Sequence, residues 1–212
     1  MLIPFKDLKR KYGLNIRGIL HAGASSGQEA EAYRDLGVTQ VTWIEGNPEL
    51  LPQLRAHVEP FGHRVIGALI SDCDGTVVPF HIANNEGQSS SLLELGTHRI
   101  VHPDVRYTHT LQLPTVTLDT LHRHHDFSAL NLLNMDLQGA ELLCLQGATE
   151  YLKCVDYVYT EINVEPLYVG CALLPELLAF LSDFEPLERQ MWPWRNGKDA
   201  GWGDLLLRRI TK

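Results

Sequence analysis

Long hydrophobic runs are absent from this sequence, and no window approaches the roughly 18 apolar residues of a membrane-spanning helix. The N-terminal residues also lack the apolar stretch of a secretory signal. Runs of Lys or Arg are missing, and the formal net charge is −8, whereas proteins that bind nucleic acid carry basic surfaces. We therefore expect a cytoplasmic protein that has no membrane partner and no nucleic-acid partner.

Cysteine is scarce, and the spacing of the four cysteines forms no C-x-x-C pair. This pattern favours reduced structural thiols over disulfide bridges or a zinc site. Histidine is more frequent, and His122, His124 and His125 lie beside Asp126. No second cluster with metal-ligand spacing accompanies them, so we expect a solvated polar patch and no metal site.

Two phosphate-binding motifs are missing as well. The chain contains no G-x-x-x-x-G-K-[ST] sequence, which excludes a P-loop. The turn Gly23–Gly27 lacks the third glycine of G-x-G-x-x-G, the motif that places a pyrophosphate on a helix N-terminus. A looser turn suits a nucleoside ligand without a pyrophosphate, and S-adenosylmethionine is the common one.

What the sequence does contain is a strand, a small-residue turn and a helix over residues 17–29, followed by a second strand over residues 41–45. The second strand ends on Glu45, 22 residues after Gly23. A Rossmann-like site uses this spacing to set a glycine turn under the ligand and a carboxylate on its ribose. An ordinary turn between a strand and a helix fits the same residues, so this pattern alone leaves both interpretations open.

Strands and helices alternate along the whole chain, which predicts one α/β domain with a mostly parallel sheet, helices on both faces and an antiparallel C-terminal hairpin at the edge. Residues 1–16 form a lead-in, and residues 84–115 form a cap over the site. The continuous apolar run over residues 65–70 predicts a parallel strand that is buried on both faces. Helical periodicity predicts helices near residues 30–36, 48–58, 118–121, 140–151 and 175–184.

Several of the expected strands end in a carboxylate, namely Glu45, Asp72, Asp136 and Glu161. The carboxyl ends of parallel strands meet in one crevice, so we expect these side chains to crowd one side of the molecule. Crowded carboxylates need partners. A sulfonium cation, a ribose diol and an adenine amino group would supply them.

Several motifs, in this order along the chain, resemble the FkbM family of S-adenosylmethionine-dependent methyltransferases over roughly residues 17–210. The motifs are Gly23–Gly27, Glu45–Pro48, Ser89–Leu92, Val116–Asp119, and above all Met135–Leu142 followed by Leu145–Ala148. The resemblance implies a class I methyltransferase fold, which is Rossmann-like. It also implies O-methylation of a small-molecule acceptor, a hydroxyl on a sugar or a secondary metabolite.

The resemblance also implies which residues hold the cofactor. The glycine turn would lie against the methionine part, Glu45 on the ribose hydroxyls, and Asp72 near the adenine amino group. Where the general pattern has Asp before the first glycine, this chain has His21, which cannot bind an ammonium as a carboxylate does, so Asp136 or a water takes that role. The full predicted cofactor set is His21, Gly23, Ala24, Gly27, Glu45, Gly46, Asn47, Ser71, Asp72 and Asp136.

Methyl transfer needs an aligned acceptor and removal of its proton. Asp136 is the first candidate for the carboxylate at the site. Glu141 either joins it or holds the strand-end loop in place. Glu161 either faces the acceptor or is a hydrogen-bonded residue at the end of a strand.

Histidine and tryptophan residues offer further candidates, each with two interpretations. His102 or His109 is either a general base from the cap or a surface residue. Trp192, Trp194 and Trp202 either stack on the acceptor or pack the C-terminal hairpin. Two other functions also remain open, a non-catalytic module that binds S-adenosylmethionine and a nicotinamide-dependent oxidoreductase.

Overall fold

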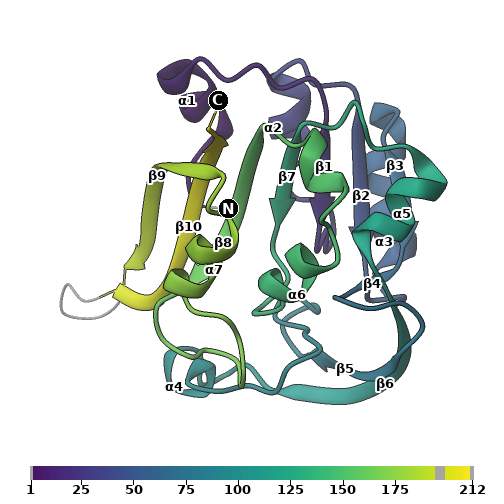
Figure 1. Ribbon diagram of the computed structural model, residues 1–212. Helices are drawn as coiled ribbons and strands as arrows, with labels where there is room; N and C mark the ends of the chain where they lie inside the picture. The colour runs from purple at the N-terminus through teal and green to yellow at the C-terminus, as the bar shows by residue number, and fades with distance from the viewer. Residues whose placement is uncertain (1, 194–198, 211–212) are drawn as a thin grey trace.

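The computed structural model describes residues 2–193 and 199–210. Its centre is a seven-stranded sheet with the strand order β3-β2-β1-β7-β8-β10-β9 (Figure 1). Neighbouring strands from β3 to β8 pair in parallel. These parallel strands are β1 (Ile19–Ala22), β2 (Val41–Glu45), β3 (Arg64–Gly67), β7 (Leu132–Met135) and β8 (Tyr157–Asn163).

The C-terminal hairpin consists of β9 (Phe184–Pro193) and β10 (Asp199–Arg209). β10 pairs antiparallel with both β8 and β9, so the strand that reverses direction lies one place in from the edge. The apolar residues Leu205–Leu207 of β10 are buried, whereas β9 carries the charged residues Glu185, Glu188 and Arg189. Charged side chains are typical of an edge strand, and the predicted antiparallel hairpin is confirmed.

Helices cover both faces of the sheet, because side chains of each buried strand alternate between two cores. Ile19 packs into one core and Leu20 into the other. The first core is covered by α1 (Phe5–Tyr12), α2 (Ala30–Asp35) and α3 (Leu51–Val58). The second is covered by α5 (Leu118–His125), α6 (Glu141–Gln146) and α7 (Leu174–Phe180). The predicted α/β fold with helices on both faces is therefore confirmed.

A second, three-stranded sheet crosses the end of the main sheet where the parallel strands finish (Figure 1). It consists of β4 (Leu69–Ile70), β6 (Tyr107–Val116) and β5 (Val77–Ala83) in that order. The prediction of one strand over residues 65–70 is wrong, since β3 ends at Gly67 and the chain moves to the second sheet at Leu69. β3 is also an edge strand with Arg64 exposed, so it is not buried on both faces.

The segment 84–115, predicted to be a cap, comprises the turn after β5, the short helix α4 (His98–Val101) and most of β6.

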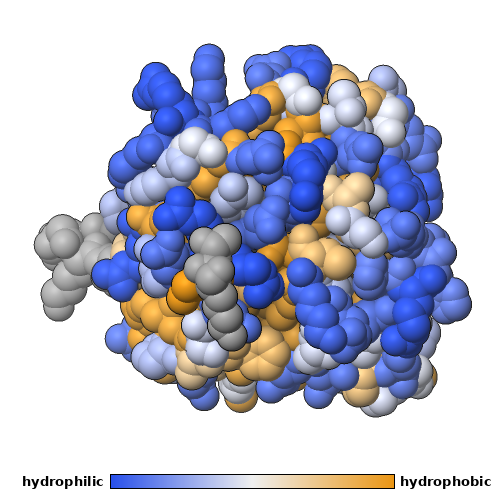
Figure 2. All heavy atoms as spheres, turned by 45° about the horizontal axis from the view of Figure 1, so that its top comes forward, coloured by the Kyte–Doolittle hydropathy of each residue, from blue (hydrophilic) through white to orange (hydrophobic). Residues whose placement is uncertain are grey.

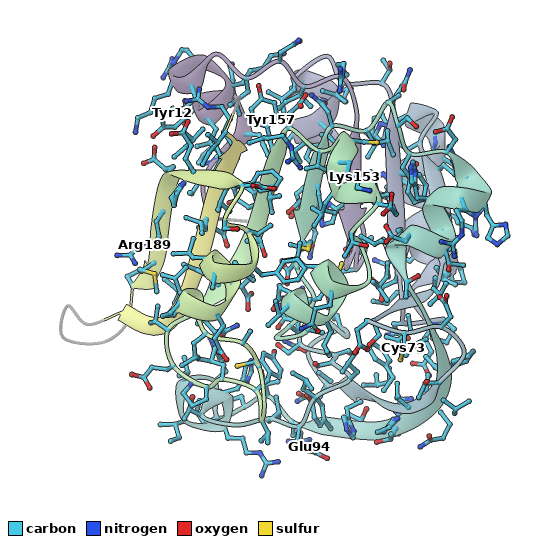
Figure 3. The ribbon with its side chains drawn as sticks, in the orientation of Figure 1. Tyr12, Cys73, Glu94, Lys153, Tyr157 and Arg189 are labelled. Atoms are coloured by element: carbon cyan, nitrogen blue, oxygen red, sulfur yellow. The ribbon has the colours of Figure 1, made fainter. Side chains whose placement is uncertain are left out.

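The two ends of the molecule differ in the elements that cover them. In Figure 3, Tyr12 and Tyr157 lie at one end and Glu94 at the other. The Tyr12 hydroxyl donates to the Leu187 carbonyl, and the Tyr157 hydroxyl accepts the Asn15 N–H. These bonds close the end that α1 covers, and the second sheet and α4 lie at the opposite end.

The face in Figure 2 carries mostly hydrophilic side chains, with hydrophobic groups visible between them. Within residues 2–193 and 199–210, no helix is long and apolar enough to cross a membrane. Free thiols are found, as the sequence predicts, at Cys73, Cys144, Cys154 and Cys171.

Candidate functional site

A cavity of about 510 Å³ opens at the carboxyl ends of the central parallel strands. Four strand-end residues that the sequence singles out line it together, namely Gly23, Glu45, Asp136 and Glu161. The cavity is also lined by residues of the second sheet, the segment after it, α4 and the C-terminal hairpin. The fold therefore brings most of the predicted carboxylates to one place, where a ligand of small-molecule size fits.

The turn after β1 brings two backbone segments unusually close. Gly23 has a φ of 83°, and a Cβ at this position would lie 1.8 Å from the Asp136 carbonyl oxygen. Only glycine fits there. Ala24 is buried in the core, and Gly27 faces Leu54 of α3, so these two predicted cofactor residues support the turn from behind and do not line the cavity.

Glu45 is held rigidly at the end of β2. One carboxylate oxygen accepts the Ser25 N–H and the other the Asn47 N–H, both at 2.6 Å. Burial raises the pKa of Glu45 to about 7, and the backbone N–H groups oppose this rise. A carboxylate oxygen can accept more than one hydrogen bond, so each oxygen has a further site for a ligand hydroxyl.

Gly46 lines the cavity beside Glu45, whereas Asn47 is buried behind it. The Asn47 side chain accepts the Glu49 N–H and so caps the turn that precedes α3. The helix begins at Leu51, three residues beyond the predicted start at Pro48, because this turn comes first. The Asn47 N–H therefore holds the Glu45 carboxylate, and the Asn47 side chain sets the direction of the chain toward α3.

His21 lines the cavity from within the core. Its ring stacks on Trp43 with the centroids 4.7 Å apart, and its Nδ1 lies 3.0 Å from the Tyr33 hydroxyl. Burial lowers the pKa of His21 to about 4, so the ring is neutral at pH 7. A neutral ring does not replace the carboxylate of the general pattern.

Ser71 and Asp72 lie away from the cavity lining. The Ser71 hydroxyl donates to the exposed Asp72 carboxylate at 3.0 Å. The chain leaves the central sheet at Ala68, whose N–H donates to the Glu45 carbonyl, and then enters the second sheet. This change of sheet separates Asp72 from the other strand-end carboxylates.

Gln138 links the carboxylates at the ends of β7 and β8. Its side-chain amide donates to Asp136 at 2.5 Å and to Glu161 at 3.2 Å. Its amide oxygen accepts the hydroxyl of the buried Tyr168 at 2.5 Å. Burial raises the pKa of Asp136 to about 6, while the bond from Gln138 opposes this rise. Burial and the neighbouring Asp136 also raise the pKa of Glu161 above its ordinary value.

Glu141 lies outside the cavity lining. One of its oxygens accepts the Leu137 N–H at 2.9 Å and the Gly139 N–H at 3.3 Å. Burial raises the pKa of Glu141 to about 7. Of the two roles that the sequence leaves open for Glu141, the structure supports the second, holding the strand-end loop.

Several residues at the far end of the cavity were not predicted from the sequence. Asp204 on β10 is buried, lines the cavity, and accepts the Leu2 N–H at 2.5 Å and the Tyr159 hydroxyl. An acidic residue beside the apolar run Leu205–Leu207 was the available signal. Tyr168 and His98 gave none, because only the folded chain brings them here.

Among the residues with two sequence interpretations, His102, Trp192 and Trp202 line the cavity. His109 does not, since its Nε2 lies 3.0 Å from Glu49 on the surface. Trp194 lies outside the described residues.

The site fits S-adenosylmethionine on its own geometry. The close approach at Gly23 packs the turn after β1 against the backbone of Asp136 at the cavity, and Glu45 presents a fixed carboxylate 22 residues later. Asp136 also lines the cavity, at the end of the neighbouring strand β7. These residues would hold the nucleoside at one end of the cavity and leave the other end for an acceptor.

This strand order with its reversed hairpin is the Rossmann-like fold of class I methyltransferases. The ribosomal protein L11 methylase from Lactobacillus delbrueckii subsp. bulgaricus has a TM-score of 0.52 at 14% identity, over 98% of this chain and 77% of that one. The magnesium protoporphyrin IX methyltransferase from Synechocystis PCC 6803, solved with bound S-adenosylmethionine, has a TM-score of 0.52 at 8% identity, over 96% and 75%. These likenesses concern the fold alone.

The methyltransferase FkbM domain matches residues 21–189, so the chain belongs to the FkbM methyltransferase family and uses S-adenosylmethionine as its methyl donor. The 2-O-methyltransferase NoeI from Sinorhizobium fredii is 28% identical over 198 residues, which are 90% of this chain and 78% of that protein. The resemblance that the sequence motifs carry is thus confirmed. The alternative of a nicotinamide-dependent oxidoreductase has no support from these relatives.

Proposed function

We propose that this protein transfers a methyl group from S-adenosylmethionine to a hydroxyl of a sugar or a related small molecule. The observation that carries the proposal is the Asp136–Gln138–Glu161 cluster, which lies in the same cavity as the Gly23 turn and Glu45. NoeI, a relative of this chain, is a 2-O-methyltransferase. A hydroxyl acceptor agrees with both observations.

S-adenosylmethionine supplies, when bound, a methyl group on a positively charged sulfur that is a good leaving group. The protein has to orient the acceptor hydroxyl and take its proton. Asp136, whose pKa is about 6, is mostly ionised at pH 7 and can accept this proton. Gln138 keeps the carboxylate in place through the 2.5 Å hydrogen bond. Glu161, whose pKa burial also raises, lies beside it and offers a second carboxyl group for a hydrogen bond to the acceptor.

The test is Asp136→Asn in a methyl-transfer assay that measures S-adenosylhomocysteine and methylated product by mass spectrometry, with a panel of neutral glycosides as acceptors. Loss of the proton acceptor should lower kcat about 100-fold to 10,000-fold. Asp35→Asn, on the exposed face of α2, is the matched control and should leave kcat unchanged. Full activity of Asp136→Asn would remove Asp136 from the proposed role.

A protein that binds S-adenosylmethionine and methylates no acceptor would instead be the non-catalytic module. Tight cofactor binding, with no methylated product from the panel or from a cell extract, would favour that function over the proposed one.

A further inference from the structure

Five aromatic rings form a continuous wall at the end of the cavity away from Glu45, and all five line the cavity. The ring centroids of Tyr168 and His98 are 5.3 Å apart, those of His98 and His102 4.8 Å, and those of His102 and Trp202 6.3 Å. Trp202 then stacks on Trp192 at 5.1 Å, with 11° between the planes. This ring wall joins the loop after β8, α4 and the C-terminal hairpin.

Two polar atoms of the ring wall are buried without a hydrogen-bond partner among the described residues. They are Nδ1 of His98, a residue only 4% exposed, and Nε1 of Trp202. A buried polar group without a partner destabilises a fold by about 1–3 kcal/mol, so folded proteins keep few of them. Both residues line the cavity, so a ligand bound here would supply these partners once the two rings turn toward it.

The two atoms also indicate what kind of ligand fits. Burial, together with the nearby His102, lowers the pKa of His98 to about 4, so its ring is neutral at pH 7. A neutral imidazole has one nitrogen that donates and one that accepts, whereas the Trp202 nitrogen only donates. A ligand with hydroxyl groups satisfies both residues, because each hydroxyl donates and accepts. A flat hydrocarbon ring satisfies neither.

The charges of the cavity restrict the ligand further. Among the described residues, no Lys or Arg lines the cavity. Five carboxylates line it, namely Glu29, Glu45, Asp136, Glu161 and Asp204. A buried anion without a partner cation pays a desolvation penalty of several kcal/mol. A phosphate or carboxylate group on the acceptor would meet this penalty whether or not the neighbouring carboxylates are protonated.

We propose that the ring wall is the acceptor subsite and that it binds a neutral or amino-bearing sugar ring, stacked on Trp202 and hydrogen-bonded to His98. The subsite rejects phosphorylated, nucleotide-linked and uronic-acid sugars. This inference rests on the proposed function, because that function makes the ligand of the ring wall the acceptor of the methyl group. It adds the charge class of the acceptor and the residues that select it.

Binding is measured without turnover, on the full chain saturated with S-adenosylhomocysteine. The probes are methyl glycosides of neutral hexoses, the matching methyl glycosides of amino sugars, hexose phosphates, hexuronates and a simple phenol, compared by saturation-transfer NMR and tryptophan fluorescence. At least one neutral or amino glycoside should bind, and its anionic counterparts should bind about tenfold more weakly or worse. Equal binding of the anionic sugars, or tighter binding of the phenol, would overturn the proposal, as would no binding of any glycoside.

Two variants test the named residues. Trp202→Phe keeps a stacking ring and removes the N–H, and His98→Phe keeps a ring and removes both nitrogens. Each should weaken the binding of the neutral glycoside about two- to tenfold, the effect of one hydrogen bond. His124→Phe, on the exposed side of α5, is the matched control and should change nothing.

Folding provides the second measurement for these variants. His98→Phe removes a buried atom that has no partner, so the melting temperature of the ligand-free protein should stay the same or rise. A clear fall would mean that Nδ1 is satisfied within the protein, which overturns the argument. A glycoside that binds but is never methylated leaves the subsite standing and contradicts the proposed function. Methylation of neutral and anionic sugars alike would support the proposed function and contradict the proposed subsite.

Discussion

Replacing Glu45 by Gln tests whether this carboxylate holds the ribose of the cofactor. Both oxygens of Glu45 accept a backbone N–H at 2.6 Å, one from Ser25 and one from Asn47. In Glu45→Gln the amide NH₂ must face one of these two donors, whichever way the side chain turns. The variant therefore loses one internal hydrogen bond and one acceptor for a ribose hydroxyl.

The size of the effect follows from the charge of the group. A hydrogen bond to a charged group contributes about 1.5–3 kcal/mol, so affinity for S-adenosylhomocysteine should fall about 10-fold to 100-fold. Isothermal titration calorimetry at pH 8, where Glu45 with a pKa of about 7 is ionised, measures this difference. At pH 6 the wild-type carboxyl is mostly protonated, and the gap between wild type and variant should narrow.

Glu31→Gln, on the exposed side of α2, is the matched control and should bind S-adenosylhomocysteine like the wild type. Circular dichroism establishes that both variants are folded. If folded Glu45→Gln bound S-adenosylhomocysteine within about twofold of the wild type at pH 8, Glu45 would have no part in holding the ribose, and the assigned cofactor end of the cavity would be wrong.

Two further changes test the support behind the site. Gly23→Ala places a Cβ 1.8 Å from the Asp136 carbonyl oxygen, so it should cost at least about 3 kcal/mol in urea unfolding. Gly37→Ala, with a similar φ of 75° and no atom within 4 Å of the new Cβ, should cost only about 1 kcal/mol; equal costs would contradict the close approach. Glu141→Gln keeps the oxygen that accepts two N–H groups and removes a carboxyl whose pKa is raised from 4.5 to about 7. The folded wild type holds this proton between these pH values after the unfolded chain has released it, so the wild type loses stability as the pH rises from about 4.5 to 7, by up to about 3 kcal/mol. Between pH 5 and pH 8 the free energy of unfolding should fall less for the variant than for the wild type. Equal falls would mean that Glu141 is not the group with the raised pKa.

The parallel strands and their carboxylates were predictable because a buried parallel strand is a short apolar run that ends where the chain turns. Glu45 and Asp136 each follow such a run directly, so their convergence on one cavity followed from the sheet topology. The break after Gly67 was not predictable. The residues on both sides of it are apolar, and only the pairing of β4 with β6 shows that they belong to a different sheet.

The far end of the cavity was not predictable for another reason. Asp204 accepts the Leu2 N–H, a contact between residues 202 positions apart, and His98 reaches Tyr168 across a separation that no local periodicity encodes. Local patterns report on the faces of one element. The ring wall joins α4, a loop and a hairpin, and it follows no such pattern. Residue type alone made His102, Trp192 and Trp202 candidates, whereas only the fold brings His98 and Tyr168 to the cavity.

The block Asp136–Glu141 is the most specific motif of the sequence. It lines the cavity through Asp136 and Gln138, and it also fixes the loop that carries them. Gln138 has a φ of 52°, a left-handed conformation that is costly for a residue with a Cβ. The Glu141 carboxylate accepts the N–H groups of Leu137 and Gly139, on either side of Gln138. The Ser91 hydroxyl donates to the Gln138 carbonyl at 2.8 Å. These bonds compensate the strain and place the Gln138 amide between Asp136 and Glu161. The block therefore fixes both the shape of the loop and the position of the Asp136 carboxylate at the cavity.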